Sequence, residues 1–298
     1  MLIDRSWSGK LRGVIIHIVV IVMGFACLLP MMNIISISLS GNRAVLGNNV
    51  GIWPVGFTLN SYRHLLDDTQ VWRSFSISVL RVVLALSISI PLIILMAYPL
   101  SKTQSQFPAR KHYMKYIIFA LLFSGGMIPT FIIVNRLRLV NTIFALVLPG
   151  AVPIFNIILM KNFFSGIPKS LEEAATIDGA SPFKILLQVY LPCSLPVLAT
   201  ISLFVIVGHW NDFFGGLVYM MQIANYPLMT YIQTLTINIA QIMALGGLSP
   251  DELERLSNIN NRNLDSAKIV LAAVPLMAIY PFLQKYFITG IVVGAVKE

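Results

Sequence analysis

The sequence predicts an all-α membrane protein with six transmembrane helices, in which residues 1–298 form a single membrane domain. The first observation is composition, since 57% of the residues are hydrophobic and only 11% are charged, against about 25% charged residues in soluble domains. The second is a series of continuous apolar runs of roughly 18 residues or more, long enough to cross a bilayer as helices. The runs do not alternate with polar residues, which disfavours a transmembrane barrel.

The six predicted spans each end where polar residues resume. They are approximately 14–38, 75–100, 113–134, 143–160, 195–219 and 267–287. The first resembles a signal peptide, but it is too long and no A-x-A cleavage site follows it, so a retained helix is expected. Several spans contain proline or glycine. These residues kink helices around a polar path, or they are simply common in membrane helices; the pattern alone favours neither explanation.

The basic residues predict the orientation. More of them fall in the N-terminal segment, in 101–112, in 161–194 and in the tail after 287 than in the segments of the opposite side. Basic residues collect on the cytoplasmic side of membrane proteins, so both termini are expected there. The net charge of +9 is explained by these loops, and nucleic-acid binding is not expected.

Two loops on the outer side are long, at about 39–74 and 220–266. In the second, Ser249 is placed to cap a short helix with Pro250 at its first position and Glu252 three residues after the cap. Loops of this length are uncommon without a function. They are expected to contact an external partner.

The cytoplasmic segment 161–194 is the most informative part of the chain. Ser170 with Glu173 has the spacing of a capping box at a helix start, and Gly179 is placed to end that helix. Ser181 and Pro182 then favour a second helix. Two short polar helices with a glycine corner predict a docking element for a soluble partner; the alternative is a plain connector.

The same segment resembles the EAA loop of permease subunits in bacterial ABC importers. The matching residues keep the full spacing of the motif: Glu173, Ala174, Ala175, Gly179, Leu191 and Pro192, with Val189 in place of isoleucine. In that family the loop sits in a groove of the ATPase subunit. The resemblance therefore implies that ATPase coupling involves Glu173, Ala174, Ala175, Ile177, Asp178, Gly179, Leu191 and Pro192.

Other stretches are similar to the oligosaccharide subgroup and to permeases of alginate importers. The run 210–213 resembles the W-N-D/E-F run of carbohydrate importers, and 97–102, 123–130 and 280–287 resemble the subgroup. Two departures are Arg138, where glycine is usual, and Thr289, where lysine is usual. The resemblance implies a type I importer permease fold with a core module at about 72–294.

The resemblance also implies partners and a location. A second homologous permease subunit, two ATPase subunits or domains, an extracytoplasmic solute-binding protein and membrane lipid are expected. The location would be the bacterial inner membrane. No G-x-x-x-x-G-K-[ST] run is present to bind ATP, and no nucleophile–base or zinc spacing is evident. Cys27 and Cys193 form no disulfide framework. The chain is therefore expected to be no enzyme and to bind no cofactor, with ATP and Mg on the partner ATPase.

Charges inside the membrane are costly and mark pathways or partners. Arg81 and Asp212 are the two candidates, and Trp210 and Asn211 beside Asp212 could stack on a sugar ring and bond its hydroxyls. The alternatives are that Arg81 snorkels or pairs with Asp212, and that Asn211 and Asp212 serve as a gate or in helix packing.

The predicted function is ATP-driven import of an oligosaccharide, with an acidic, alginate- or pectin-like substrate as the first choice. The outer basic residues Arg136 and Arg138, with Arg81, suit a polyanionic sugar. A neutral oligosaccharide is the alternative. A secondary transporter driven by an ion gradient is a further rival, although internal repeats and several midplane carboxylates are expected of one; a membrane scaffold without transport activity is another.

Overall fold

A computed structural model describes residues 7–235 and 261–295 of the chain, and these form helices joined by turns, without strands. The fold divides into two compact units, one of residues 1–69 and 235–274 and one of residues 70–234 and 275–298. Each unit is described by itself below. The predicted cap at Ser249, Pro250 and Glu252 lies outside the described residues.

The first unit contains α1 (Trp7–Ser38), α2 (Asn42–Leu46), α3 (Asn60–Asp67) and the first half of α16 (Asn261–Ala295). From Val14 to Pro30 the side chains of α1 are exposed, as expected of a helix that faces lipid. A small core of Leu65, Leu264 and Ala267 joins α3 to α16. The Asn263 amide donates to the Ser40 carbonyl at 2.6 Å, which satisfies a buried polar group.

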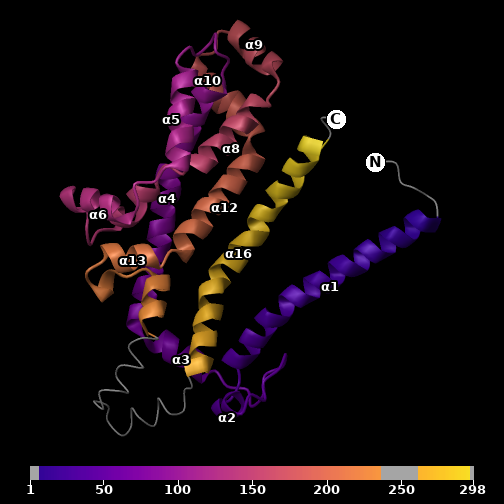
Figure 1. Ribbon diagram of the computed structural model, residues 1–298, viewed down its shortest axis with the longest axis vertical. Coiled ribbons are helices and arrows are strands. Elements are labelled where there is room, and N and C mark those ends of the chain that lie inside the picture. The colour runs from indigo at the N-terminus through magenta and orange to yellow at the C-terminus, as the bar shows by residue number, and fades with distance from the viewer. Residues whose placement is uncertain (1–6, 236–260, 296–298) are drawn as a thin grey trace. The chain divides into compact units, whose positions relative to one another are not determined.

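The second unit carries most of the helices, shown in Figure 1. They are α4 (Thr69–Ser101), α5 (Arg110–Leu122), α6 (Met127–Arg136), α7 (Ile143–Val147), η1 (Leu148–Gly150), α8 (Ile154–Ser165), α9 (Lys169–Ile177), α10 (Pro182–Ile185), η2 (Leu186–Tyr190), α11 (Leu191–Cys193), α12 (Leu195–Asn211), α13 (Phe214–Tyr219) and η3 (Ile223–Asn225). Of these, η1 and η3 are 3-10 turns and η2 is a π-helical turn.

Helix α4 is the longest element of this unit. Its 33 residues correspond to about 50 Å at 1.5 Å per residue, so it exceeds the hydrocarbon core of about 30 Å. Helix α8 packs beside both α5 and α12. The fully buried Ile93, Ile157 and Ile201 join α4, α8 and α12 in one core.

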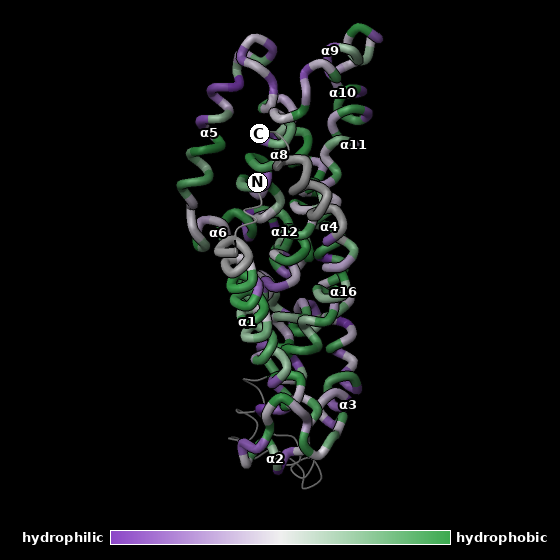
Figure 2. Tube along the Cα trace, turned by 90° about the vertical axis from the view of Figure 1, so that its right-hand side faces the viewer, coloured by the Kyte–Doolittle hydropathy of each residue, from purple (hydrophilic) through white to green (hydrophobic). Residues whose placement is uncertain are grey.

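Helix α5 is polar at its first turn and mainly apolar towards its end. In Figure 2 the tube of α5 changes from purple at its first turn to green along its length, because Arg110 and Lys111 precede the run from Ile117 to Leu122. Three single helices and three bent pairs are long and apolar enough to cross a membrane in the described part of the chain. That number agrees with the six predicted crossings.

Three of the predicted spans contain a break, as the proline and glycine residues within them allowed. The span at 113–134 is the pair α5 and α6, bent by 111°, and Gly126 at the break adopts φ 82°, which a residue without a Cβ tolerates. The span at 143–160 bends by 50° before α8. The span at 195–219 stops at Asn211, and α13 is a separate helix. The length of an apolar run does not show where such a break falls, because the segments at the breaks are as apolar as the helices.

Arg138 adopts the left-handed conformation, with φ 55°. Few L-residues adopt it, and glycine does so readily. The backbone therefore explains why glycine is usual at this position in the family that the sequence resembles. In this chain an exposed arginine carries the strain.

Gly216 lies on α13 against the buried Thr230. A Cβ at Gly216 would lie 2.8 Å from the Thr230 Cβ and would overlap its Oγ1, which donates to the Phe213 carbonyl at 2.8 Å. Replacement of Gly216 by alanine is expected to lower the free energy of unfolding by about 1–3 kcal/mol, as overpacking does. Thermal unfolding in detergent measures it.

Gly208→Ala is the matched control, since nothing lies within 4 Å of a Cβ at that position. Alanine in a helix interior is favoured over glycine by about 0.5–1 kcal/mol. An equal unfolding temperature for the two variants would contradict the packing of α13 against Thr230.

Candidate functional site

The α9–α10 corner has the backbone that its sequence predicts. The Gly179 amide donates to the Thr176 carbonyl and the Ala180 amide to the Ala175 carbonyl, both at 3.0 Å. Gly179 has φ 76°. This is the Schellman arrangement, which satisfies the last carbonyls of a helix. The predicted helix stop at Gly179 is confirmed.

The predicted start of α10 is also confirmed, but the start of α9 is not. The Ser181 hydroxyl accepts from the Lys184 amide, and Pro182 is the first residue of α10. Helix α9 begins at Lys169 after Pro168, without a side-chain cap. Ser170 therefore lies inside the helix and forms no capping box with Glu173. With Pro168 at the N-cap, the helix starts two residues earlier than the serine signal indicates.

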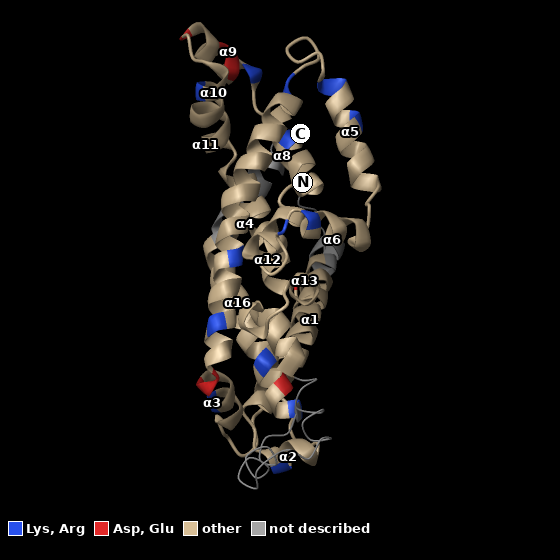
Figure 3. Cartoon of the chain, turned by 90° about the vertical axis from the view of Figure 1, so that its left-hand side faces the viewer, with Lys and Arg blue, Asp and Glu red and all other residues tan. Residues whose placement is uncertain are grey.

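The exposed surface of the α9–α10 corner is acidic and apolar. Glu173, Ala174, Ile177, Asp178 and Phe183 are exposed, and we call them the α9–α10 surface. Ile177 is 86% exposed and Phe183 is 60% exposed. Figure 3 shows acidic positions in red on α9, among helices that are mostly uncharged. Exposed large apolar side chains beside charges are typical of a protein-binding surface.

The remaining motif residues have other positions. Ala175 and Leu191 are half-buried and pack against the core of α4, α8 and α12. Pro192 is exposed. Ala175 and Leu191 thus attach the corner to the membrane helices, and the part of these residues in ATPase coupling stays a prediction.

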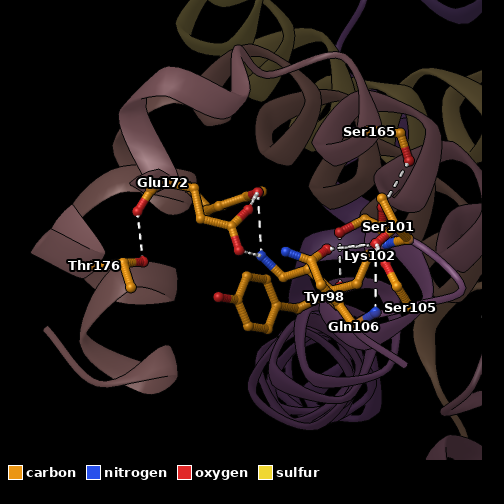
Figure 4. A network of polar contacts seen from close by, with 10 residues as sticks. Tyr98, Ser101, Lys102, Ser105, Gln106, Ser165, Glu172 and Thr176 are labelled. Atoms are coloured by element: carbon orange, nitrogen blue, oxygen red, sulfur yellow. Dashed lines mark hydrogen bonds and ion pairs between the residues drawn. The ribbon is translucent and has the colours of Figure 1, made fainter. Parts of the chain in front are cut away.

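A polar cluster under α9 was not predicted from the sequence. The Lys102 Nζ lies 2.7 Å from Glu172 Oε1 and donates to the Tyr190 hydroxyl at 3.2 Å. The Tyr190 hydroxyl donates to Glu172 Oε2 at 2.6 Å. We call these three residues the polar clamp; Figure 4 shows Lys102 reaching Glu172 beside Tyr98.

The acidic member of the polar clamp, Glu172, is held in its charged form. Burial by itself raises the pKa of Glu172, but the hydrogen bonds from Lys102 and Tyr190 and the Lys102 charge outweigh it and hold the pKa below its ordinary value. Burial lowers the pKa of Lys102, and Glu172 offsets part of that change. Glu172 is therefore ionised at neutral pH. The only sequence signals were a lysine after a span and a second acid beside the motif, and neither indicates that they meet.

Gly179 offers a direct test of the corner. Valine at this position is expected to destabilise the end of α9 by about 1–2 kcal/mol, because the left-handed conformation is costly for a residue with a Cβ. Asparagine, which tolerates that conformation, is expected to remain close to the wild type. Hydrogen exchange of the amides at 169–180 measures the difference, and equally slow exchange in Gly179→Val would contradict it.

The buried Arg81 and the half-buried Asp212 form an ion pair in the second unit. The Arg81 guanidinium bonds to Asp212 Oδ2, donates to the Asp212 carbonyl at 2.9 Å and donates to the Leu146 carbonyl at 3.2 Å. The Gly215 amide donates to Asp212 Oδ1 at 2.9 Å. The arrangement joins α4 to the break between α12 and α13, so the ion pair that sequence analysis left as an alternative is present.

The ion pair lines a cavity of about 340 Å³. Asn156, His209 and Tyr219 contribute further polar groups to its wall. Trp210 does not line it; its side chain is only 5% exposed and its ring lies edge-on to Phe75 at 5.9 Å. Asn211 is exposed and does not line it either. The structure thus brings Arg81 and Asp212 together and places Trp210 and Asn211 elsewhere.

No group of three or more histidine, cysteine or acidic side chains within reach of one metal ion occurs in the described residues. Cys27 and Cys193 are free and exposed. The candidate site consists of the exposed α9–α10 surface, the polar clamp beneath it and the separate ion pair of Arg81 and Asp212.

Several helices that are long and apolar enough to cross a membrane, with a short polar helical corner in the second unit, define a multi-pass membrane protein. Residues 70–293 match the family model described as the inner membrane component of binding-protein-dependent transport systems. The chain belongs to this family. The resemblance seen in the EAA motif is confirmed.

Two relatives from Bacillus subtilis match along almost the whole chain. The protein LplC is 37% identical over 92% of this chain and 91% of its own length. The polygalacturonan/rhamnogalacturonan transport system permease protein YtcP is 35% identical over 97% of this chain and 99% of its own.

A solved structure has the same fold. It belongs to a bacterial ABC transporter involved in the import of the acidic polysaccharide alginate. The similarity has a TM-score of 0.83 at 30% identity and covers 95% of this chain and 98% of that one.

Proposed function

We propose that this chain is the membrane-spanning permease subunit of an ATP-driven ABC importer for oligosaccharides. The observation that carries the proposal is the α9–α10 surface, an exposed acidic and apolar corner in a chain of this family. Glu173, Ile177 and Phe183 would contact a groove of the ATPase. ATP and Mg would bind to that partner, and ATP-driven closure of the ATPases would move segment 161–194 as a rigid body.

The other partners follow from the same assignment. A second homologous permease subunit would complete the pathway, and an extracytoplasmic solute-binding protein would deliver the sugar to the outer loops at about 39–74 and 220–266. The chain would lie in the bacterial inner membrane with both termini in the cytoplasm. Arg81 and Asp212 would then hold the pathway helices together or act as a gate.

The substrate is proposed to be an acidic oligosaccharide. The descriptions of two similar proteins mention polygalacturonan and rhamnogalacturonan and the acidic polysaccharide alginate, which support a uronic-acid substrate. Arg136 and Arg138 are exposed near the end of α6 and could attract carboxylates at long range. Arg81 is occupied by Asp212, so it would be the least available of the three arginines.

Uptake into vesicles containing the complete importer tests the proposal. Labelled oligouronate of three to five units should enter only when ATP is inside and the binding protein outside, and a neutral oligosaccharide of equal length should enter at least about tenfold more slowly. Preference for the neutral sugar would overturn the acidic substrate. Uptake that persists without ATP but stops with an ionophore would overturn the importer and favour a gradient-driven carrier.

A further inference from the structure

Helix α9 is held to the rest of its unit by few contacts. None of its nine residues is buried, and a cavity of about 700 Å³ lies between α9 and the turn after α4. Ala175, and Ala180 just beyond the helix, touch the core. The strongest polar contact between α9 and the membrane helices in the described residues is therefore the clamp of Lys102, Glu172 and Tyr190.

Each member of the clamp comes from a different element. Lys102 directly follows the last residue of α4, Glu172 lies in the first turn of α9, and Tyr190 ends the π-helical turn η2. Both carboxylate oxygens of Glu172 are engaged, one by Lys102 and one by Tyr190. A carboxylate held at two points by different elements fixes the orientation of α9 better than a single bond does.

Aromatic rings hold the clamp in place. The Lys102 ammonium lies 4.1 Å from the centre of the Tyr98 ring and 4.4 Å from that of Tyr190, within the range of cation–π attraction. The Tyr190 ring is edge-on to Tyr98 at 5.1 Å and to Phe164 at 5.3 Å. These contacts join the clamp to the packed ends of α4 and α8.

The two adjacent acidic residues of α9, Glu172 and Glu173, have different surroundings. Successive residues of an α-helix point about 100° apart. Glu172 reaches Lys102 and Tyr190, whereas Glu173 is exposed and only borders the cavity beside α9. A movement imposed on α9 would therefore reach Lys102 and Tyr190 through Glu172.

We propose that Lys102, Glu172 and Tyr190 are positioning residues that transmit movement of the docking helix to α4. The inference rests on the proposed function, in which α9 contacts the ATPase. Without the clamp, α9 would still bind the ATPase through the α9–α10 surface, but it would move relative to α4 towards the adjacent cavity. ATP would be hydrolysed with less sugar moved.

The test compares sugar imported per ATP hydrolysed by the complete reconstituted importer. Lys102→Met and Glu172→Gln are each expected to lower this ratio at least about fivefold, within the usual range of coupling free energies, while the ATPase still copurifies. Lys102→Arg should retain most of the ratio. The double variant should fall no further than the worse single variant, because both remove one interaction.

Tyr190→Phe removes only the hydroxyl and should lower the ratio by a smaller factor. Lys111→Met, at an exposed lysine on α5, is the matched control and should not change the ratio.

Variants that reach the membrane in lower amounts but import the same sugar per ATP would overturn the proposal, since the clamp would then only support folding. Additive losses in the double variant would also overturn it. Failure of the wild-type importer to use ATP would instead refute the proposed function.

Discussion

Replacement of Glu173 by lysine is expected to abolish ATP-driven uptake while leaving the chain in the membrane. Glu173 is exposed on the α9–α10 surface, so the change removes no internal contact of the described fold. A reversed charge opposite a basic partner surface costs several kcal/mol, which corresponds to ATPase binding weakened on the order of 100-fold.

Copurification of the ATPase with the permease in detergent measures this effect. Glu173→Gln, which loses the charge but keeps the shape, should give an intermediate loss. His112→Lys adds a positive charge at an exposed position on α5 and should behave as the wild type. Full ATPase binding by Glu173→Lys would refute the role of this surface, and uptake should be recorded for the same preparations.

The second large effect is expected at the ion pair of Arg81 and Asp212. Removing one partner of an ion pair leaves the other charge uncompensated, at a typical cost of about 3–5 kcal/mol when the remaining charge is buried. The two single variants are expected to differ, because the Arg81 side chain is 2% exposed and that of Asp212 is 36% exposed. Asp212→Leu leaves the deeply buried guanidinium without its carboxylate and should lower stability more than Arg81→Met.

The double variant Arg81→Met with Asp212→Leu should be more stable than Asp212→Leu alone. Replacing both charges by apolar groups removes the desolvation penalty together with the attraction. Thermal unfolding in detergent compares the four proteins, and Arg136→Met at an exposed arginine should change little. Strictly additive losses would show that the two charges do not stabilise each other.

Uptake by the same four proteins separates packing from gating. A double variant that regains stability but fails to import would assign the pair to the pathway. A double variant that regains both would assign it to helix packing. Either outcome decides between the alternatives that the residue types alone left open.

Local sequence signals were enough to predict the class of this protein and the turn between α9 and α10. Apolar runs of sufficient length demand helices in lipid, because a bilayer offers no partner for backbone groups. Glycine at 179 and Ser181 with Pro182 act through local geometry, so the end of α9 and the start of α10 could be predicted. Helix α9 begins directly after Pro168 and not after Ser170, so the start predicted from the serine was wrong.

Which side chains meet depends on how helices distant in the sequence pack together. Lys102 and Glu172 lie far apart along the chain, as do Arg81 and Asp212, and one sequence carries no signal for such pairing. The bend between α5 and α6 and the burial of Trp210 against Phe75 have the same origin. Local rules place caps, turns and lipid-facing surfaces, whereas the partner of a buried charge depends on how separate helices pack, because its desolvation must be compensated by whatever the fold brings within reach.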